Sequence, residues 1–309
     1  MHLLLHMGNY KTGSTFLEHL CYVNADRLCA HGIYYGKALD APICSHAQFS
    51  HSVLREALTH LGFFSFVEDH PLWNYIQETP QSFLTALKKE ALAKQCDTIL
   101  LSHEGMFCEC FRTLIGLHGH NFDGRKFSIN PLDADILDAV LAQYHRSLHD
   151  VLLKAFSPVD INIILYQRET KDYLISQYNQ FLKAPWYEKN PGDHLPDFQS
   201  FLSYAPVRED VSYPLEILSS FYGKDAVSFR AYEDVREDLA GDFFSQMHLP
   251  KEFAAQCKLP DKAARNESLS QETLDFILRF LSPEQARDPK LQALLLTYSQ
   301  AHPDPPGSH

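Results

Sequence analysis

Two glycines five positions apart follow the first apolar run of the chain. Residues 8–15 read Gly-Asn-Tyr-Lys-Thr-Gly-Ser-Thr, so Gly8 and Gly13 keep the spacing of a phosphate-binding P-loop. A P-loop places lysine directly after its second glycine, whereas here Ser14 takes that position and Lys11 lies inside the loop. Backbone N–H groups of such a loop surround an anion, and the hydroxyls of Ser14 and Thr15 add donors. The segment predicts an anion-binding loop.

The sequence on either side of the loop gives it the required context. Leu3–Leu5 is expected to form a buried strand, and residues 14–30 carry apolar side chains at helical spacing. A helix that begins directly after the loop directs its first N–H groups and the positive end of its dipole at the anion.

A second segment places an arginine at the end of an apolar run. Residues 163–168 read Ile-Ile-Leu-Tyr-Gln-Arg, and Ser176 follows Arg168 by eight positions, about two turns into an expected helix over 170–182. Asp172 and Ser176 share one face of that helix. An arginine at a strand end and a serine on a helix are common surface features. The segment therefore indicates a binding site only in combination with the loop.

Together these segments resemble the donor site of sulfotransferases that use 3′-phosphoadenosine 5′-phosphosulfate (PAPS). The run from His6 to Thr15 is similar to the 5′-phosphosulfate loop of the family, and Arg168 with Ser176 is similar to its 3′-phosphate segment, although Thr170 stands where the family often has proline. The resemblance implies that the 5′-phosphosulfate is bound by Gly8, Tyr10, Lys11, Thr12, Gly13, Ser14 and Thr15.

Two further segments resemble parts of the family. Arg265-Asn266-Glu-Ser268-Leu-Ser270 is similar to the loop that folds over the nucleotide in bacterial members, which implies cofactor contacts from Arg265, Asn266 and Ser268. Tyr232-Glu233-Asp234 also resembles a family segment. Helix capping by an acidic residue explains the latter equally well, so we assign it no chemistry.

Sulfuryl transfer needs in-line attack and stabilisation of charge on the leaving group, which positioning and fixed cations supply. The resemblance makes Lys11 the residue that meets this charge. We expect no metal, because neither of the apolar runs 98–101 and 161–166 ends in the aspartate that holds a metal in nucleotide triphosphatases. Cys108 and Cys110 with His103 could suggest a metal site, but their C-x-C spacing suits a strand or turn better.

An acceptor group must also lose its proton. Ser102-His103-Glu104 ends an apolar run, and open α/β sheets place their sites at the carboxyl ends of parallel strands. The family often has Ser-x-Glu or Ser-Glu here, which favours Glu104 as the general base. His103 remains the alternative, because a neutral imidazole suits this role near pH 7. We expect His6 to pack beside the loop without a catalytic role.

The acceptor itself is not readable from the sequence. A hydroxyl or amine of a carbohydrate, a lipid or a small molecule would use the same donor site with different loops. Two other functions stay open: a P-loop nucleotide-dependent kinase, and a non-catalytic nucleotide-binding protein of the same fold. Ser14 argues against a kinase, because a P-loop kinase has lysine at this position.

Strand-like and helix-like segments alternate along most of the chain, which predicts an α/β fold with a three-layer, doubly wound parallel sheet and a helical C-terminal part. We expect one domain over 1–301, with insertions near 116–131 and 183–196, and a disordered tail over 302–309. The expected strands cover 3–5, 32–35, 98–101, 161–166 and 226–229, and the expected helices cover 14–30, 81–94, 133–156, 170–182, 213–222 and the region from 268 onward.

Composition limits the partners. The 27 basic and 39 acidic residues give a net charge of −12, which disfavours nucleic acid and anionic membranes as partners. A phosphorylated small molecule remains compatible, because a local group of donors can bind it. No run reaches transmembrane length, and the seven scattered cysteines are typical of a reducing compartment, so we expect a cytoplasmic protein.

Overall fold

The computed structural model describes residues 1–8, 12–36, 45–62, 78–107, 134–183, 198–199, 213–260, 269–282, 285 and 288–302. Contacts within the chain define two compact units. The first unit comprises Met1–Cys110, Asp138–Glu169 and Asp210–Arg265, and the second comprises Phe111–Leu137, Thr170–Glu209 and Asn266–His309. The insertions near 116–131 and 183–196 and the tail lie outside the described residues, apart from Lys183 and His302. The single domain over 1–301 stays a prediction.

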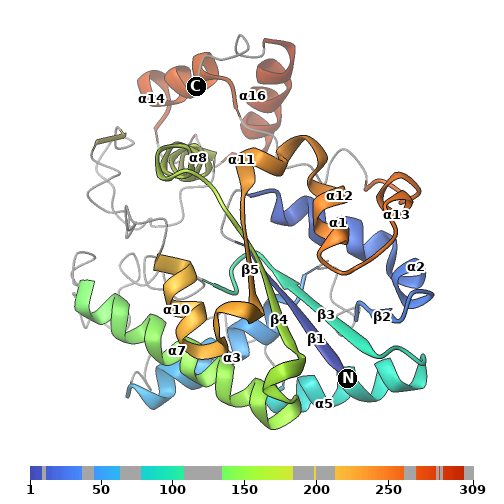
Figure 1. Cartoon of the computed structure of the whole chain (residues 1–309). Coiled ribbons are helices and arrows are strands. Elements are labelled where there is room, and N and C mark those ends of the chain that lie inside the picture. Colours follow the sequence, from blue (N-terminus) through green and yellow to red (C-terminus); the bar gives the residue numbers. More distant parts are fainter. Residues whose placement is uncertain are drawn as a thin grey trace. The chain divides into compact units, whose positions relative to one another are not determined.

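The first unit is built on a parallel sheet with the strand order β2-β3-β1-β4-β5 (Figure 1). Its strands are β1 (His2–Met7), β2 (Ile33–Tyr34), β3 (Thr98–His103), β4 (Ile161–Gln167) and β5 (Val227–Ala231). All five predicted strands are confirmed. The three central strands read as nearly continuous apolar runs because helices cover both of their faces.

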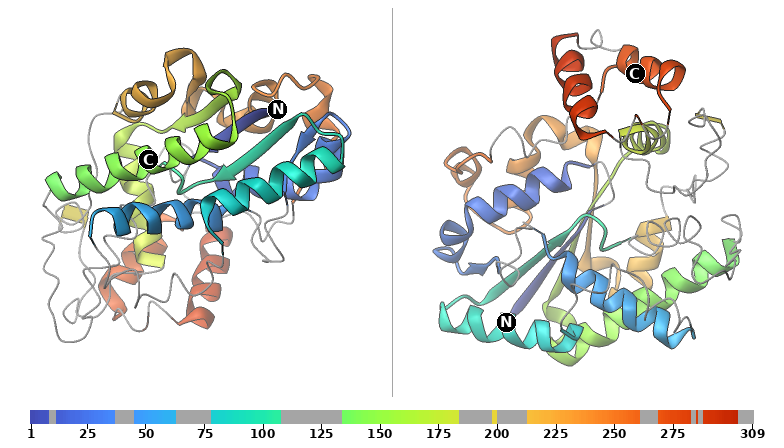
Figure 2. Two further views of the ribbon diagram at one scale, coloured as in Figure 1. Left: turned by 90° about the horizontal axis from the view of Figure 1, so that it is seen from below. Right: turned by 180° about the vertical axis from the view of Figure 1, so that it is seen from behind.

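Helices lie on both faces of this sheet, which confirms the three-layer, doubly wound α/β fold (Figure 2). On one face α1 and α12 pack against Leu4, Leu100 and Ile164 of the central strands. The other face carries α3, α5 and α7, with the rings of Phe49 and Phe83 stacked 5.5 Å apart between the first two. The bounds are α1 (Ser14–Val23), α2 (Ala25–Cys29), α3 (Ala47–His60), α5 (Pro80–Ala93), α7 (Ala134–Ala155), α10 (Tyr213–Tyr222), α12 (Leu239–Ser245) and α13 (Glu252–Ala255).

The predicted continuous helix over 14–30 is wrong, because the chain breaks at Asn24 between α1 and α2. The Asn24 side-chain amide donates to the carbonyls of Leu20 and Lys258, at 2.8 Å each, and its oxygen accepts the Lys258 N–H at 2.8 Å. A side chain that competes for backbone groups in this way ends a helix. The partner at 258 is too far along the sequence for apolar spacing to reveal the break.

The other predicted helices within the described residues are confirmed, but the short helices α12 and α13 and the longer helix α3 were missed. Buried polar side chains at Ser50, His51 and Ser52 interrupt the apolar pattern that would have revealed it. Ser50 is satisfied by the hydroxyl of Tyr144 on α7, at 2.8 Å. A buried polar residue with a distant partner looks like a surface residue in the sequence alone.

The second unit has a small core of its own. Tyr178 of α8 (Thr170–Lys183) and Leu274 and Ile277 of α14 (Gln271–Phe280) belong to one buried cluster with Leu295 of α16 (Pro289–Ala301). This confirms the helical C-terminal part, with Ser270 at the N-cap of α14. Across the described ranges, no helix combines the length and apolar character needed to cross a bilayer.

The chain continues from β1 and from β4 toward opposite edges of the sheet. From β1 the chain runs through α1 toward β2 on one side of the sheet, whereas from β4 it runs toward β5 on the other side. The adjoining carboxyl ends of β1 and β4 therefore form a topological switch point. Open α/β sheets bind their ligands at such points.

Candidate functional site

Gly13 starts α1 at the switch point. Its φ of 75° lies in the left-handed region, and a Cβ built on it would lie 2.5 Å from Cδ2 of Leu239. Both the conformation and the space therefore require glycine. Gly13 has no side chain to cap the helix and the first turn of α1 has no acidic residue, so the positive end of the dipole can act on an anion.

The hydroxyl residues of the loop meet at this helix start. Thr12 and Ser14 are buried, with their side-chain oxygens 3.2 Å apart, and Thr15 donates to Oε2 of Glu104 at 3.2 Å. The structure thus brings three of the predicted binding residues together with one candidate base. Tyr10 and Lys11 lie outside the described residues, as do Arg265, Asn266 and Ser268.

Gly8 occupies the point where β1, α1 and the residue after β3 converge. A Cβ on Gly8 would lie 2.2 Å from Oγ of Ser14 and 3.2 Å from Cα of Glu104. Real side chains do not tolerate the first of these contacts, so any residue other than glycine must displace Ser14 or shift the backbone of the loop. The first glycine of the motif is therefore explained by close approach of the backbone.

Glu18 fixes the chain after β3. Its side chain is buried on α1, and its Oε1 accepts the N–H of Glu104 at 2.7 Å. Sequence reasoning missed this residue. A signal existed, because Glu18 stands between Leu17 and Leu20 on the apolar part of the helix, where an acidic residue needs a partner.

The two candidate bases have different surroundings. Glu104 is joined to α1 through Thr15 and Glu18, whereas the ring of His103 packs against the ring of His51 on α3, with centroids 5.8 Å apart. Glu104 lies directly after β3, and its contacts with Thr15 and Glu18 place it beside α1.

Two buried histidines hold Ser102. Nδ1 of His6 lies 2.7 Å from the Ser102 hydroxyl, and the Ser102 N–H donates to Nδ1 of His46 at 3.0 Å. Burial, with a smaller contribution from nearby His103, lowers the pKa of His6 to about 3. Burial also lowers the pKa of His46 to about 4. Both imidazoles are neutral at pH 7, and the packing role predicted for His6 is confirmed.

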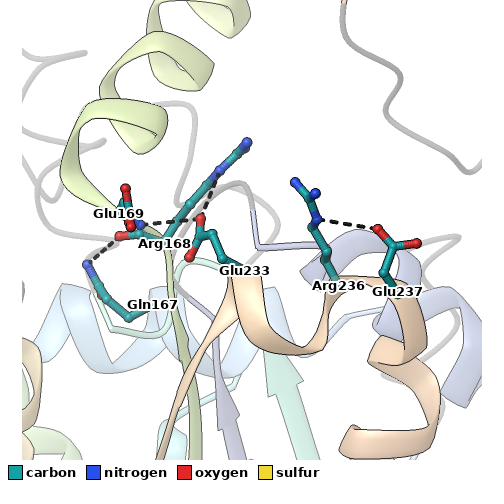
Figure 3. A network of polar contacts seen from close by, with 6 residues as sticks. All are labelled: Gln167, Arg168, Glu169, Glu233, Arg236 and Glu237. Carbon is teal, nitrogen blue, oxygen red and sulfur yellow. Dashed lines mark hydrogen bonds and ion pairs between the residues drawn. The ribbon is translucent and has the colours of Figure 1, made fainter. Parts of the chain in front are cut away.

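Arg168 directly follows β4 and contacts two residues that directly follow β5 (Figure 3). Its Nε lies 3.6 Å from Oε1 of Glu233, and its guanidinium carbon lies 5.6 Å from the ring centroid of Tyr232. The same Glu233 oxygen accepts the N–H of Glu169 at 3.4 Å. Both partners belong to the short helix α11 (Tyr232–Val235), to which the sequence analysis assigned no chemistry. Ser176 lies on α8 in the second unit.

Metal binding finds no support in the part of the chain that the structure describes, where no group of three or more His, Cys, Asp or Glu side chains could hold an ion. Cys108 and Cys110, considered with His103 in the sequence analysis, lie outside that part.

Fold and site together define a parallel α/β protein with a glycine loop between its first strand and first helix. No family model matches the chain, and no curated protein matches its sequence. Among solved structures, it is similar to the crystal structure of a sulfotransferase from Alicyclobacillus acidocaldarius, with 12% sequence identity and a TM-score of 0.42 over 94% of this chain and 98% of that chain. So distant a likeness leaves the chemistry to be argued from this chain's own residues.

We expect Gly8→Ala to destabilise the first unit by about 1–3 kcal/mol, because the new methyl group overlaps Ser14. Urea denaturation measures the change. Ser14→Ala alone is the control, and Gly8→Ala with Ser14→Ala should recover part of the loss, since the hydroxyl is the nearest atom. Equal stability of Gly8→Ala and the native protein would contradict the close approach.

Acid should destabilise the fold through its buried histidines. Because the pKa of His6 is lowered from 6.5 to about 3, the unfolded chain binds more protons between these values, and stability falls as pH drops below 6.5. Each such group contributes a slope of about 1.4 kcal/mol per pH unit. His6→Gln should flatten the dependence of the unfolding free energy on pH between 6.5 and 4.5 by about that amount. Exposed His60 provides the control His60→Gln; parallel profiles for His6→Gln and native protein would refute the assignment.

Proposed function

We propose that this chain is a sulfotransferase that transfers the sulfuryl group of PAPS to a hydroxyl or amine of an acceptor. The observation that carries the proposal is the loop after β1. Gly8 and Gly13 both stand where a side chain would collide, the lysine lies between them, and α1 begins directly behind. This arrangement suits an anionic group that is bound by backbone N–H groups and one internal cation.

The donor residues follow from this arrangement and from the family resemblance. The 5′-phosphosulfate would lie against residues 8–15, and Arg168 at the end of β4 would bind the 3′-phosphate together with Ser176. Arg265, Asn266 and Ser268 would complete the nucleotide site.

The reaction would form a bond between the acceptor oxygen or nitrogen and sulfur while the bond from sulfur to the bridging oxygen breaks. Lys11 would meet the negative charge that grows on the leaving oxygen, and Glu104 would take the acceptor proton. Support for Glu104 comes from its contact with Thr15, which joins it to the loop helix. No metal has a part in these steps.

A P-loop kinase would share the sheet and the loop. In such an enzyme lysine follows the second glycine, yet here Ser14 fills that position, is buried and lies against Thr12. The strands β3 and β4 end in His103 and Gln167, where a kinase of this type would be expected to show a metal-binding aspartate. These features favour sulfuryl over phosphoryl transfer.

The proposed acceptor is a carbohydrate, a lipid or another small molecule, and we propose a cytoplasmic location. Nucleic acid is disfavoured by the net charge of −12. Binding of the donor product would justify a screen of acceptors from these classes.

We expect the protein to bind 3′-phosphoadenosine 5′-phosphate (PAP) without metal and more tightly than ATP with magnesium. Lys11→Ala and Arg168→Ala should each weaken PAP binding by about 10- to 100-fold, the usual effect of losing a hydrogen bond to a charged group. Isothermal titration calorimetry measures both. Preference for ATP with magnesium, or no binding of PAP, would overturn the proposal.

Glu104→Gln should lower kcat by about 10²- to 10⁴-fold while PAP affinity stays within about twofold, because the amide cannot accept the proton. His103→Asn should retain most of the activity. Transfer from radiolabelled PAPS to a panel of hydroxyl and amine acceptors measures both variants. The reverse ranking would assign the base to His103.

A further inference from the structure

We propose that Glu233 is a positioning residue that orients Arg168 toward the 3′-phosphate of the donor. This inference rests on the proposed function, because it assigns a role to Glu233 within the same nucleotide site. Glu233 belongs to α11, which follows β5, whereas Arg168 follows β4.

The pairing of strands explains how the two residues meet. β4 and β5 are parallel neighbours, with Gln167 opposite Ala231 at their carboxyl ends. Arg168 directly follows β4 and Tyr232 directly follows β5, and Glu233 comes next after Tyr232. The Glu233 carboxylate therefore lies beside the end of β4 and accepts the N–H of Glu169. The two residues are 64 positions apart in the sequence.

One carboxylate oxygen restrains both the side chain and the backbone of this turn. Oε1 of Glu233 lies 3.6 Å from Nε of Arg168 and 3.4 Å from the N–H of Glu169 (Figure 3). On the other side of the turn, the Gln167 amide donates to the Arg168 carbonyl at 3.3 Å. The peptide group that joins Arg168 to Glu169 is thus held at both its carbonyl and its N–H.

Arg168 pairs with Glu233 through Nε and not through its terminal nitrogens. Because Nε faces Glu233, the two terminal nitrogens extend past the carboxylate, as Figure 3 shows. These nitrogens form the fork that binds a phosphate through two parallel hydrogen bonds. The side chains of Arg168 and Glu233 are only 26% and 27% exposed, so water screens their attraction less than at an open surface.

A carboxylate beside an anion-binding arginine can also act against binding, since it repels the phosphate and competes for the guanidinium. The two roles predict opposite signs. If Glu233 orients Arg168, removing its charge weakens binding of a ligand with a 3′-phosphate. If it only competes, removing its charge strengthens that binding.

The test uses Glu233→Gln, whose amide oxygen can still accept the Glu169 N–H while the ion pair with Arg168 is lost. Calorimetric titrations with PAP and with adenosine 5′-phosphate, which lacks the 3′-phosphate, compare the two ligands. We expect PAP affinity to fall about fivefold and adenosine 5′-phosphate affinity to stay unchanged. Glu237→Gln is the matched control, because Glu237 is 92% exposed and pairs with its sequence neighbour Arg236 at 3.4 Å.

A double-mutant cycle isolates the effect. In an Arg168→Ala background, Glu233→Gln should leave PAP affinity unaltered, because no guanidinium remains to orient. Tighter PAP binding by Glu233→Gln, equal loss for both ligands, or an undiminished effect in the Arg168→Ala background would each overturn the proposal.

A ligand-free measurement separates this inference from the proposed function. The Nε–H resonance of Arg168, assigned in NMR spectra by its loss in Arg168→Lys, should shift in Glu233→Gln and stay in place in Glu237→Gln. If that shift occurs but the native protein binds no PAP, the proposed function fails while the contact with Glu233 stands. If PAP binds but the resonance does not move, the positioning role fails.

Discussion

Because Gly8 has no side chain, the end of β1, the start of α1 and the residue after β3 can meet. The register of β1 with β3 places His6 opposite Ser102, so the chain leaves both strands at nearly the same level. The Gly8 backbone then approaches both Ser14 and Glu104, with no room for a methyl group. Because the helix start and the end of β3 are fixed against the same residue, the loop between Gly8 and Gly13 has both of its ends anchored. An anion-binding loop gains affinity when its backbone is held in place before the ligand arrives.

The carboxylates around this point act chiefly as acceptors for groups of the chain. Glu18 accepts the N–H of Glu104, Glu104 accepts the Thr15 hydroxyl, and Glu233 accepts the Glu169 N–H. Each bond ties the end of one strand to a helix that follows another. The acidic side chains thus hold the carboxyl edge of the sheet together.

The sequence predicted the strands well because the central strands are covered on both faces and must be apolar throughout. It showed the spacing of Gly8 and Gly13, but not the contacts with Glu104 and Leu239 that require glycine at these positions. It did not show what Glu18 and Glu233 bind, because their partners lie 86 and 64 positions away. Periodicity reports which face of an element is buried, whereas a buried carboxylate is justified only by a partner on another element. The same limit explains the break at Asn24, whose side chain binds residue 258.

The proposed donor carries two anionic groups, so its binding would have to overcome repulsion from the protein's net charge of −12. Neutral histidines help in a specific way. His6 and His46 lie beside the ends of β1 and β3 but carry no charge at pH 7, because burial holds the pKa of each far below 7. They supply hydrogen bonds to Ser102 without adding a cation that a nearby carboxylate could recruit. In the proposed site, the attraction for an anion would come from the helix start and from the cations placed at the strand ends. Of the described cations at these ends, Arg168 keeps its terminal nitrogens directed away from its carboxylate partner. A local field built from fixed groups can therefore act against the sign of the whole molecule, since it operates at contact distance while the distant charges are screened by salt.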